Sequence, residues 1–225
     1  MGYMVQQTLQ NKLRGLKVDR EVVTLVTQVL VDKNDKSIKN PTKFVGARYS
    51  KEEIVKLAKQ LNWSVKEQEP GSWRRVVPSP MPEYIMHGKS IKALVDRGTI
   101  VIAFGGGGIP VFNNNNGQIE GLDAVIDKDF SAAKMGRIIR AQELWIISDI
   151  DYLYSNFGTE NARPIKEIDT KDLQSLYNQN TFQEGTIKPK IKAALRFLKH
   201  HGDKVIITSI NKIKLAIEKK IRHNY

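Results

Sequence analysis

The segment "TIVIAFGGGGIPVF", residues 99–112, joins two apolar runs through four consecutive glycines. Residues 99–104 are rich in β-branched side chains, which is typical of a strand buried on both faces of a parallel sheet. Gly105, Gly106, Gly107 and Gly108 follow at the carboxyl end of that strand. Because ligands bind at the carboxyl ends of strands in open α/β sheets, the segment predicts a parallel sheet and a binding loop.

Strand and helix patterns alternate along the rest of the chain. Apolar runs predict buried strands at residues 21–31, 99–104, 143–148 and 204–209, and shorter strands at 63–68 and 73–80. Helical periodicity and capping residues predict helices over residues 5–15, 50–61, 89–98, 127–140, 170–178, 188–201 and 211–222. The polar residues 32–49 predict a long loop. This alternation indicates the α/β class with a mainly parallel sheet.

Composition narrows the range of partners. The 225 residues carry 36 Lys and Arg against 24 Asp and Glu, a net charge of +12, which favours anionic ligands. The lysines are spread over many elements and no recognition-helix motif occurs, so nucleic acid is not the expected partner. No apolar run approaches the roughly 20 residues of a membrane helix. The absence of cysteine excludes disulfides and thiolate metal sites and fits a reducing cytoplasm.

The four glycines do not belong to either common phosphate motif. A P-loop would continue with Gly-Lys-Ser/Thr, and a dinucleotide fingerprint needs a glycine where Pro110 stands. Consecutive amides without β-carbons can still approach an anion closely. The alternative is purely structural, a wide bulge or a tight crossing of two chain segments.

Three further segments carry candidate ligand-binding residues. In "AVIDKDFSA", Asp127, Lys128 and Asp129 lie at a strand-to-helix junction, where Lys128 can face a phosphate and the acids can orient it. The alternative is a solvated helix cap. In "EGTIKPKIKAALRF", Gly185 and Thr186 precede a helix whose first turn holds Lys188 and Lys190. Cations there oppose the helix dipole, a misfit that is expected where an anion must be received.

The third segment is "ISDIDYLY", where four polar or aromatic residues follow a buried strand: Asp149, Asp151, Tyr152 and Tyr154. Such side chains are suited to hold a ribose and to flank a base. An ordinary polar strand exit would look the same. The motif therefore leaves both interpretations open.

Seven motifs in order resemble one family. The motifs "TQVLVDKND", "NPTKFVG", "RRVVPSPMP", "GGGGIPV", "AVIDKD", "YSNFGT" and "PKIKAALRF" are similar to those of carbamate kinases, from the first residues to about Asn211. The resemblance implies the amino acid kinase fold, a three-layer αβα sandwich. It also implies phosphate transfer between ATP and carbamate with Mg²⁺, running from carbamoyl phosphate towards ATP in arginine fermentation.

The resemblance also assigns roles. It implies a phosphoryl clamp of Lys33, Lys128 and Lys190, with Asp127 and Asp129 orienting lysines. Gly105–Gly108 would line the phosphate and substrate, and the wall around the nucleoside would contain Asp149, Asp151, Tyr152 and Tyr154. Residues 1–98 would be the rest of a substrate lobe with a protruding lid at about 36–80, and 99–225 a nucleotide-binding lobe.

The family's N-terminal strands and two of its glycine loops have no counterpart here. We therefore expect an N-terminally truncated kinase with impaired activity, in a self-associating form such as the family's homodimer. Two other classes stay open. One is a remnant or regulatory subunit that binds nucleotide without turnover, and the other is a basic nucleic-acid-binding protein.

Overall fold

The computed structural model describes residues 1–156, 159–182, 187–200 and 202–223. The chain divides into two compact units, Met1–Ser131 and Ala132–Tyr225. The expected functional boundary at residues 98 and 99 stays a prediction.

Unit 1, Met1–Ser131, combines parallel and antiparallel sheets with four helices and the first turn of α5. The helices are α1 (Gly2–Gly15), α2 (Lys36–Lys39), α3 (Lys51–Leu61) and α4 (Gly88–Asp96). The strands are β1 (Val22–Thr24), β2 (Gln28–Val31), β3 (Lys43–Tyr49), β4 (Val65–Glu69), β5 (Ser72–Val77), β6 (Pro82–Ile85), β7 (Ile100–Ile102), β8 (Ile109–Asn113) and β9 (Ile119–Gly121). Strand β1 pairs with β7 in parallel, β6-β2-β8-β9 form a second sheet, and β3-β5-β4 form a third.

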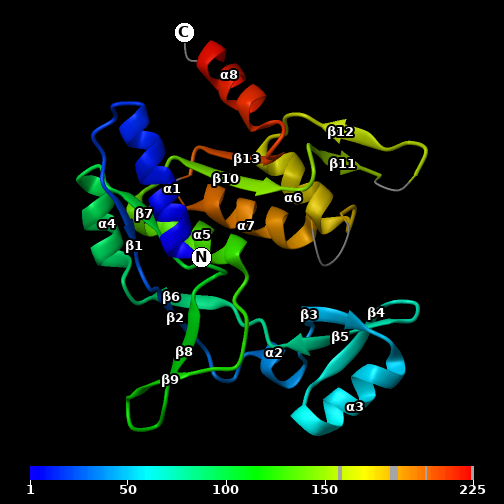
Figure 1. The fold of residues 1–225 in the computed structure, drawn as a ribbon. Coiled ribbons are helices and arrows are strands. Elements are labelled where there is room, and N and C mark those ends of the chain that lie inside the picture. Colours follow the sequence, from blue (N-terminus) through cyan, green and yellow to red (C-terminus); the bar gives the residue numbers. More distant parts are fainter. Residues whose placement is uncertain (157–158, 183–186, 201, 224–225) are drawn as a thin grey trace. The chain divides into compact units, whose positions relative to one another are not determined.

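The single long strand expected over residues 21–31 is wrong. The run forms two strands, β1 and β2, which belong to different sheets (Figure 1). The break lies at Thr27, a polar residue that is only 2% exposed. Its hydroxyl donates to the Leu25 carbonyl at 3.1 Å, and its own carbonyl accepts from the Ile109 amide at 2.9 Å. These bonds direct the chain out of one sheet and into the next.

The long loop expected over residues 32–49 is also wrong, because it contains α2 and β3. The Asp35 carboxylate caps α2 by accepting from the Ser37 amide at 2.8 Å. Strand β3 pairs antiparallel with β5, with Lys43 opposite Val77. Gly46 has a φ of 71° within β3, so the glycine that suggested a loop is an irregularity inside a strand.

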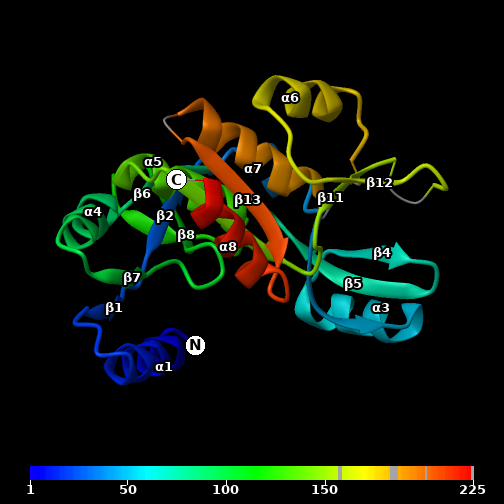
Figure 2. The same cartoon turned by 90° about the horizontal axis from the view of Figure 1, so that it is seen from above.

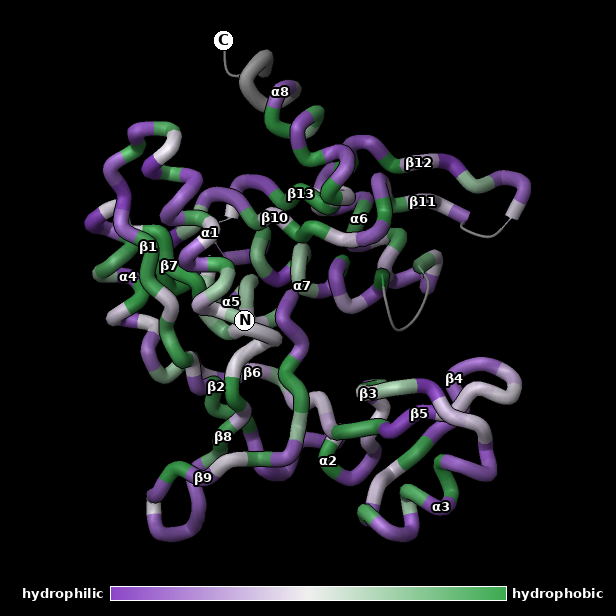
Figure 3. Tube along the Cα trace, in the orientation of Figure 1, coloured by the Kyte–Doolittle hydropathy of each residue, from purple (hydrophilic) through white to green (hydrophobic). Residues whose placement is uncertain are grey.

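Several sequence predictions in unit 1 are confirmed. Helix α3 begins at the predicted capping box, in which the Ser50 amide donates to the Glu53 carboxylate at 2.9 Å. Helix α4 and strands β4, β5 and β7 lie within a few residues of the expected positions. Strands β1 and β7 are hydrophobic, whereas the turn between β8 and β9 is hydrophilic (Figure 3). Helix α1 begins three residues before the expected start and has no buried residue.

Unit 2, Ala132–Tyr225, is built on a parallel pair of strands. Its helices are the rest of α5 (Lys128–Ile139), α6 (Thr170–Asn178), α7 (Ile187–Lys199) and α8 (Ile213–His223). Its strands are β10 (Glu143–Ser148), β11 (Leu153–Ser155), β12 (Arg163–Ile165) and β13 (Lys204–Ser209). Strands β10 and β13 pair in parallel, and α7 packs against both (Figures 1 and 2).

The core of unit 2 forms where α7 meets its neighbours. Ile191 is fully buried on α7 and packs in one cluster with Leu153, Leu173 and Phe182. Phe197, at 2% exposure, lies about one and two-thirds turns further along the same helix. The α/β class with parallel strands is therefore confirmed. No helix in the described ranges is long and apolar enough to cross a membrane.

Candidate functional site

The glycine loop follows β7 in unit 1 and has an unusual backbone. Positive φ angles occur at Phe104 (68°), Gly105 (65°), Gly107 (119°) and Gly108 (98°). A β-carbon at Gly107 would lie 2.1 Å from the carbonyl oxygen of Ile126, and one at Gly108 would lie 2.4 Å from a methyl group of Val29. These two glycines therefore allow a tight crossing of chain segments, one of the two alternatives left open by the sequence.

The other half of the loop is open. A β-carbon at Gly105 or Gly106 would meet no atom within 4 Å, and both residues are exposed. Within the described residues, the amides of Gly106 and Gly107 donate to no acceptor. Gly107 itself is buried, and buried amides in native proteins almost always have a partner. The loop thus presents two adjacent N–H groups, which is the arrangement that binds anions.

A charged cluster lies where α5 begins, next to this loop. Lys43, from β3, makes an ion pair with Asp127, with 2.8 Å between Nζ and Oδ2. The second carboxylate oxygen of Asp127 accepts from the Asp129 amide at 3.0 Å. A β-carbon at Gly107 would lie 3.4 Å from the Lys128 amide, so the loop and the first turn of α5 are in contact.

The ion pair sets the charge state of Asp127. Burial by itself would raise the pKa of this carboxyl group, but the hydrogen bond and charge of Lys43, the Asp129 amide and the charge of Lys128 outweigh it. The pKa of Asp127 therefore lies below its ordinary value, and the carboxylate is ionised at neutral pH. Lys128 is exposed, and no hydrogen-bond partner of its ammonium group occurs in the described part of the chain.

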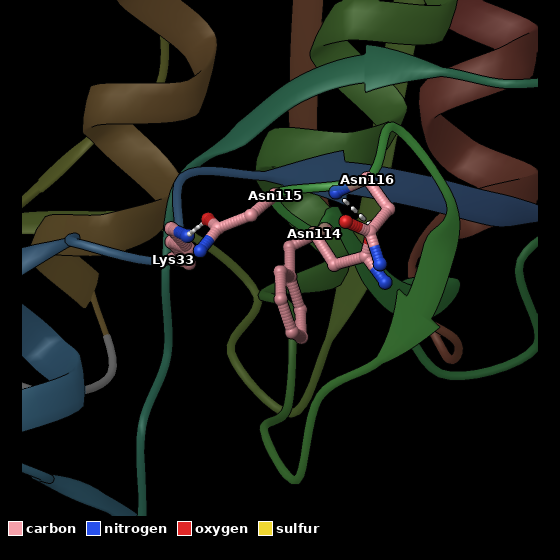
Figure 4. Close-up of a pocket in the computed structure, with 5 residues that line it drawn as sticks. Lys33, Asn114, Asn115 and Asn116 are labelled. Carbon is pink, nitrogen blue, oxygen red and sulfur yellow. Dashed lines mark hydrogen bonds between the residues drawn. The ribbon is translucent and has the colours of Figure 1, made fainter.

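Lys33 lies in a different place in unit 1, at a hollow of about 350 Å³ lined by Lys33, Phe112, Asn114, Asn115 and Asn116 (Figure 4). Its Nζ donates to the side-chain oxygen of Asn115 at 2.8 Å. The Asn116 amide donates to Asn114 at 2.9 Å and closes the turn. Lys33 thus contacts the turn between β8 and β9, and its assigned role in phosphoryl transfer stays a prediction.

The candidate residues of unit 2 gather at the carboxyl ends of β10 and β13. Ser148 and Ser209 are register partners at these ends. The Ser148 hydroxyl donates to Asp149 at 2.9 Å, and the Ser209 hydroxyl donates to Asp151. The bonds from Ser148 and from the backbone lower the pKa of Asp149, with a smaller contribution from the charge of Lys190. Parallel pairing of β10 with β13 therefore places Asp149 and Asp151 at the same edge of the sheet, and the charge of Lys190, in the first turn of α7, acts on Asp149. The role of these residues around a nucleotide stays a prediction.

The other candidate residues of unit 2 belong to the β11–β12 hairpin, to the residue before it and to α7. Tyr152 directly precedes β11, and Tyr154 is opposite Pro164 in the β11–β12 hairpin. Lys188 donates to Asn180 at 2.8 Å. Gly185 and Thr186, and the Phe157-Gly158 pair of the motif "YSNFGT", lie outside the described residues.

Lys43 is the residue that the sequence analysis missed. It belongs to the motif "NPTKFVG", but the polar residues around it predict a loop, in which a lysine carries no indication of a role. The local signal for a strand was weak, because Phe44, Val45 and Tyr49 favour a strand but Gly46 interrupts them. The pairing of β3 with β5 then places this lysine beside a residue 84 positions later in the chain.

Comparison with known proteins gives consistent matches. The model of the amino acid kinase family matches residues 10–209. The chain is 42% identical to the carbamate kinase of Pyrococcus horikoshii over 220 residues, which is 98% of this chain and 70% of that protein. It is 40% identical to the carbamate kinase of Staphylococcus epidermidis over 222 residues, 98% of this chain and 72% of that protein.

Solved structures agree with the sequence matches. The carbamate kinase of Giardia lamblia bound to AMP-PNP superimposes with a TM-score of 0.84 at 34% identity, covering 96% of this chain and 69% of the other. The same enzyme bound to citric acid gives a TM-score of 0.87 at 34% identity, covering 97% and 69%.

Proposed function

This chain belongs to the amino acid kinase family, and we propose that it transfers a phosphoryl group between ATP and carbamate, as a carbamate kinase. The sequence identity of 40–42% to curated carbamate kinases supports this substrate pair. The observation that carries the proposal is the cluster at the start of α5, where Lys43, Asp127 and Lys128 lie against the glycine loop. In cells the reaction would run from carbamoyl phosphate towards ATP, as in arginine fermentation, in the cytoplasm.

The cluster suits phosphoryl transfer because this reaction depends mainly on positioning and on neutralising charge. The amides of Gly106 and Gly107 would donate to phosphate oxygens, and the exposed ammonium group of Lys128 would neutralise the transferred group. Asp127 would keep Lys43 in place through their ion pair. No covalent nucleophile is needed, which agrees with the lack of cysteine.

The nucleotide would bind to unit 2. Asp149, Asp151, Tyr152 and Tyr154 would form the wall around the nucleoside, and Lys190 would contact its phosphates. The described residues contain no group of three or more His, Asp or Glu side chains able to hold a metal ion. Mg²⁺ usually binds through substrate phosphates and few carboxylates, so these residues fit an ion that arrives with ATP or ADP. The ion would shield the charge of the phosphates during transfer.

A coupled assay of ATP formation from ADP and carbamoyl phosphate tests the proposal. Lys128→Met should lower kcat on the order of a hundredfold or more, because the positive charge that neutralises the transferred group is lost. Lys39→Met is the matched control, an exposed lysine of α2 outside the cluster, and it should retain wild-type turnover. Equal turnover of both variants at saturating substrate would contradict the assigned role of Lys128.

Binding measurements separate catalysis from simple nucleotide binding. Lys190→Ala should weaken binding of ADP more than that of adenosine, since the lost contact is to phosphate. A wild-type chain that binds ADP but forms no ATP would be a nucleotide-binding protein without turnover, and the kinase proposal would then be wrong. The proposed homodimer would appear in sedimentation velocity as a species of twice the chain mass.

A further inference from the structure

The glycine loop needs external support to keep its shape. Four of its five residues from Phe104 to Gly108 have positive φ angles, and Phe104 carries a side chain that disfavours this region. The amides of Gly106 and Gly107, which donate to no acceptor in the described residues, point in a fixed direction only while these angles are held. The contacts that hold the loop therefore decide whether it can bind an anion.

The first such contact is made by Thr27, in the break between β1 and β2. Its hydroxyl accepts from the Phe104 amide at 3.2 Å and donates to the Leu25 carbonyl at 3.1 Å. Its backbone carbonyl accepts from the Ile109 amide at 2.9 Å. Thr27 therefore binds both ends of the loop, Phe104 and Ile109, while being only 2% exposed.

The second contact is made by Ser131, one turn into α5. This residue is fully buried, and its hydroxyl donates to the Gly107 carbonyl at 2.6 Å. Its amide donates to the Asp127 carbonyl at 3.2 Å, within the same helical turn that carries Lys128. Ser131 thus fixes the peptide groups of the loop relative to the charged cluster.

We infer that Thr27 and Ser131 are positioning residues, whose buried hydroxyl groups hold the glycine loop so that the amides of Gly106 and Gly107 face a phosphate group. This inference rests on the proposed function for its ligand. Neither hydroxyl has access to a ligand, because both residues are buried and both hydroxyls are bonded to the backbone. Their effect on binding must pass through the conformation of the loop.

The conformation can be measured without any ligand. In protein labelled with ¹⁵N-glycine, Thr27→Val and Ser131→Ala should shift or broaden the amide signals of Gly105, Gly106, Gly107 and Gly108. Thr27→Ser keeps the hydroxyl and should give the wild-type loop signals. Thr24→Val is the matched control, since Thr24 of β1 also bonds a backbone carbonyl through its hydroxyl, at 3.2 Å, but to Gly2.

Ligand affinity is the second readout, with carbamoyl phosphate as the probe and adenosine as the comparison. Thr27→Val and Ser131→Ala should weaken binding of carbamoyl phosphate about three- to tenfold, the usual effect of one lost hydrogen bond. Affinity for adenosine should stay within twofold, and Thr27→Ser should bind as the wild type does. If Thr27 and Ser131 only stabilised the fold, their variants would have a lower melting temperature but would not lose affinity for carbamoyl phosphate more than for adenosine.

The outcomes separate the two proposals. If the wild type binds no carbamoyl phosphate, the proposed function of the loop is wrong, while the glycine spectra still test the support by Thr27 and Ser131. If Thr27→Val and Ser131→Ala keep the wild-type spectrum and affinity, the positioning role is overturned. If Thr27→Ser, which keeps the hydroxyl group, is as impaired as Thr27→Val, the hydroxyl is not sufficient to hold the loop, and the positioning role assigned to it is overturned.

Discussion

At the residue scale, the ion pair of Lys43 and Asp127 makes the stability of the fold depend on pH. The folded state lowers the pKa of Asp127 below its ordinary value of 3.8, although burial acts in the opposite direction. A carboxyl group with a lowered folded-state pKa stabilises the protein above its unfolded-state pKa. That stabilisation is lost as the pH falls through the folded-state value. The effect therefore belongs to the acid range, below about pH 4.

We expect Lys43→Met to raise the pKa of Asp127, because burial is then no longer offset by the lysine. The variant should begin to unfold at a higher pH than the wild type and should lose about 1 kcal/mol of stability at pH 7. Acid titration followed by circular dichroism measures the first effect, and urea unfolding measures the second. Lys39→Met is the control, and superimposable acid curves for all three proteins would contradict the prediction.

Glycines of the loop should differ sharply in their tolerance of alanine. Gly105→Ala adds a β-carbon in open space at a φ of 65°, which should cost about 1 kcal/mol. Gly107→Ala has a φ of 119° and a β-carbon 2.1 Å from the Ile126 carbonyl, so it should cost more than about 3 kcal/mol. Urea unfolding of the two variants compares the costs. Equal destabilisation would show that the positive φ angle, and not the contact with Ile126, determines the cost of adding a β-carbon.

At the element scale, α5 and α7 approach each other at one phenylalanine. A β-carbon at Gly136 of α5 would lie 2.6 Å from the ring of Phe197 on α7, and one at Gly202 would lie 2.2 Å from the same ring. The ring is therefore confined between two glycines and has little room to move. This contact fixes how closely the two helices pack.

Gly136→Ala should destabilise the protein by about 1–3 kcal/mol, because the ring cannot yield. Adding Phe197→Leu should make the two costs less than additive, since the smaller side chain admits the methyl group. Thermal or urea unfolding of the double-mutant cycle tests this coupling. Gly121→Ala, where a β-carbon meets nothing within 4 Å, is the control and should change stability little. Strict additivity would mean that the contact is not tight.

Most elements could be predicted from sequence, because local signals and tertiary contacts agree there. Helix α3 follows its capping box, and β10 and β13 follow from their apolar runs. The failures occur where a distant contact overrides the local pattern. The break at Thr27 depends on Ile109 and Phe104, which lie about 80 residues away in the chain. Residues in the same run gave no local sign of this break.

The candidate site shows the same division. The sequence identified the glycine loop and the residues around Lys128 because these motifs are continuous in the chain. It could not indicate that Lys43 pairs with Asp127, since the pairing depends on β3 joining the sheet with β5. It also could not identify Thr27 or Ser131, whose roles depend on burial and on bonds across 77 and 24 residues.

At the scale of the whole molecule, the net charge of +12 should govern the salt dependence of binding. A strongly basic protein attracts multiply charged anions, and salt screens this attraction within about 10 Å at 0.1 M. Affinity for ADP should therefore fall clearly between 0.05 and 0.5 M potassium chloride, about tenfold or more, while affinity for uncharged adenosine stays nearly constant. Calorimetric titrations at several salt concentrations check this, and parallel losses for both ligands would argue against an electrostatic origin.

The parallel pairing of distant strands also determines how the polypeptide acquires its structure. Strand β1 pairs residue 22 with residue 100, and β2 pairs residue 28 with residue 109, so long chain segments must close before either sheet exists. The β4–β5 hairpin, by contrast, pairs residue 65 with residue 75. Folding rates fall as contacts become less local. In pulsed hydrogen exchange during refolding, amides of β4 and β5 should become protected before those of β1 and β7. During the interval between these two events, the apolar strands would be most exposed to aggregation.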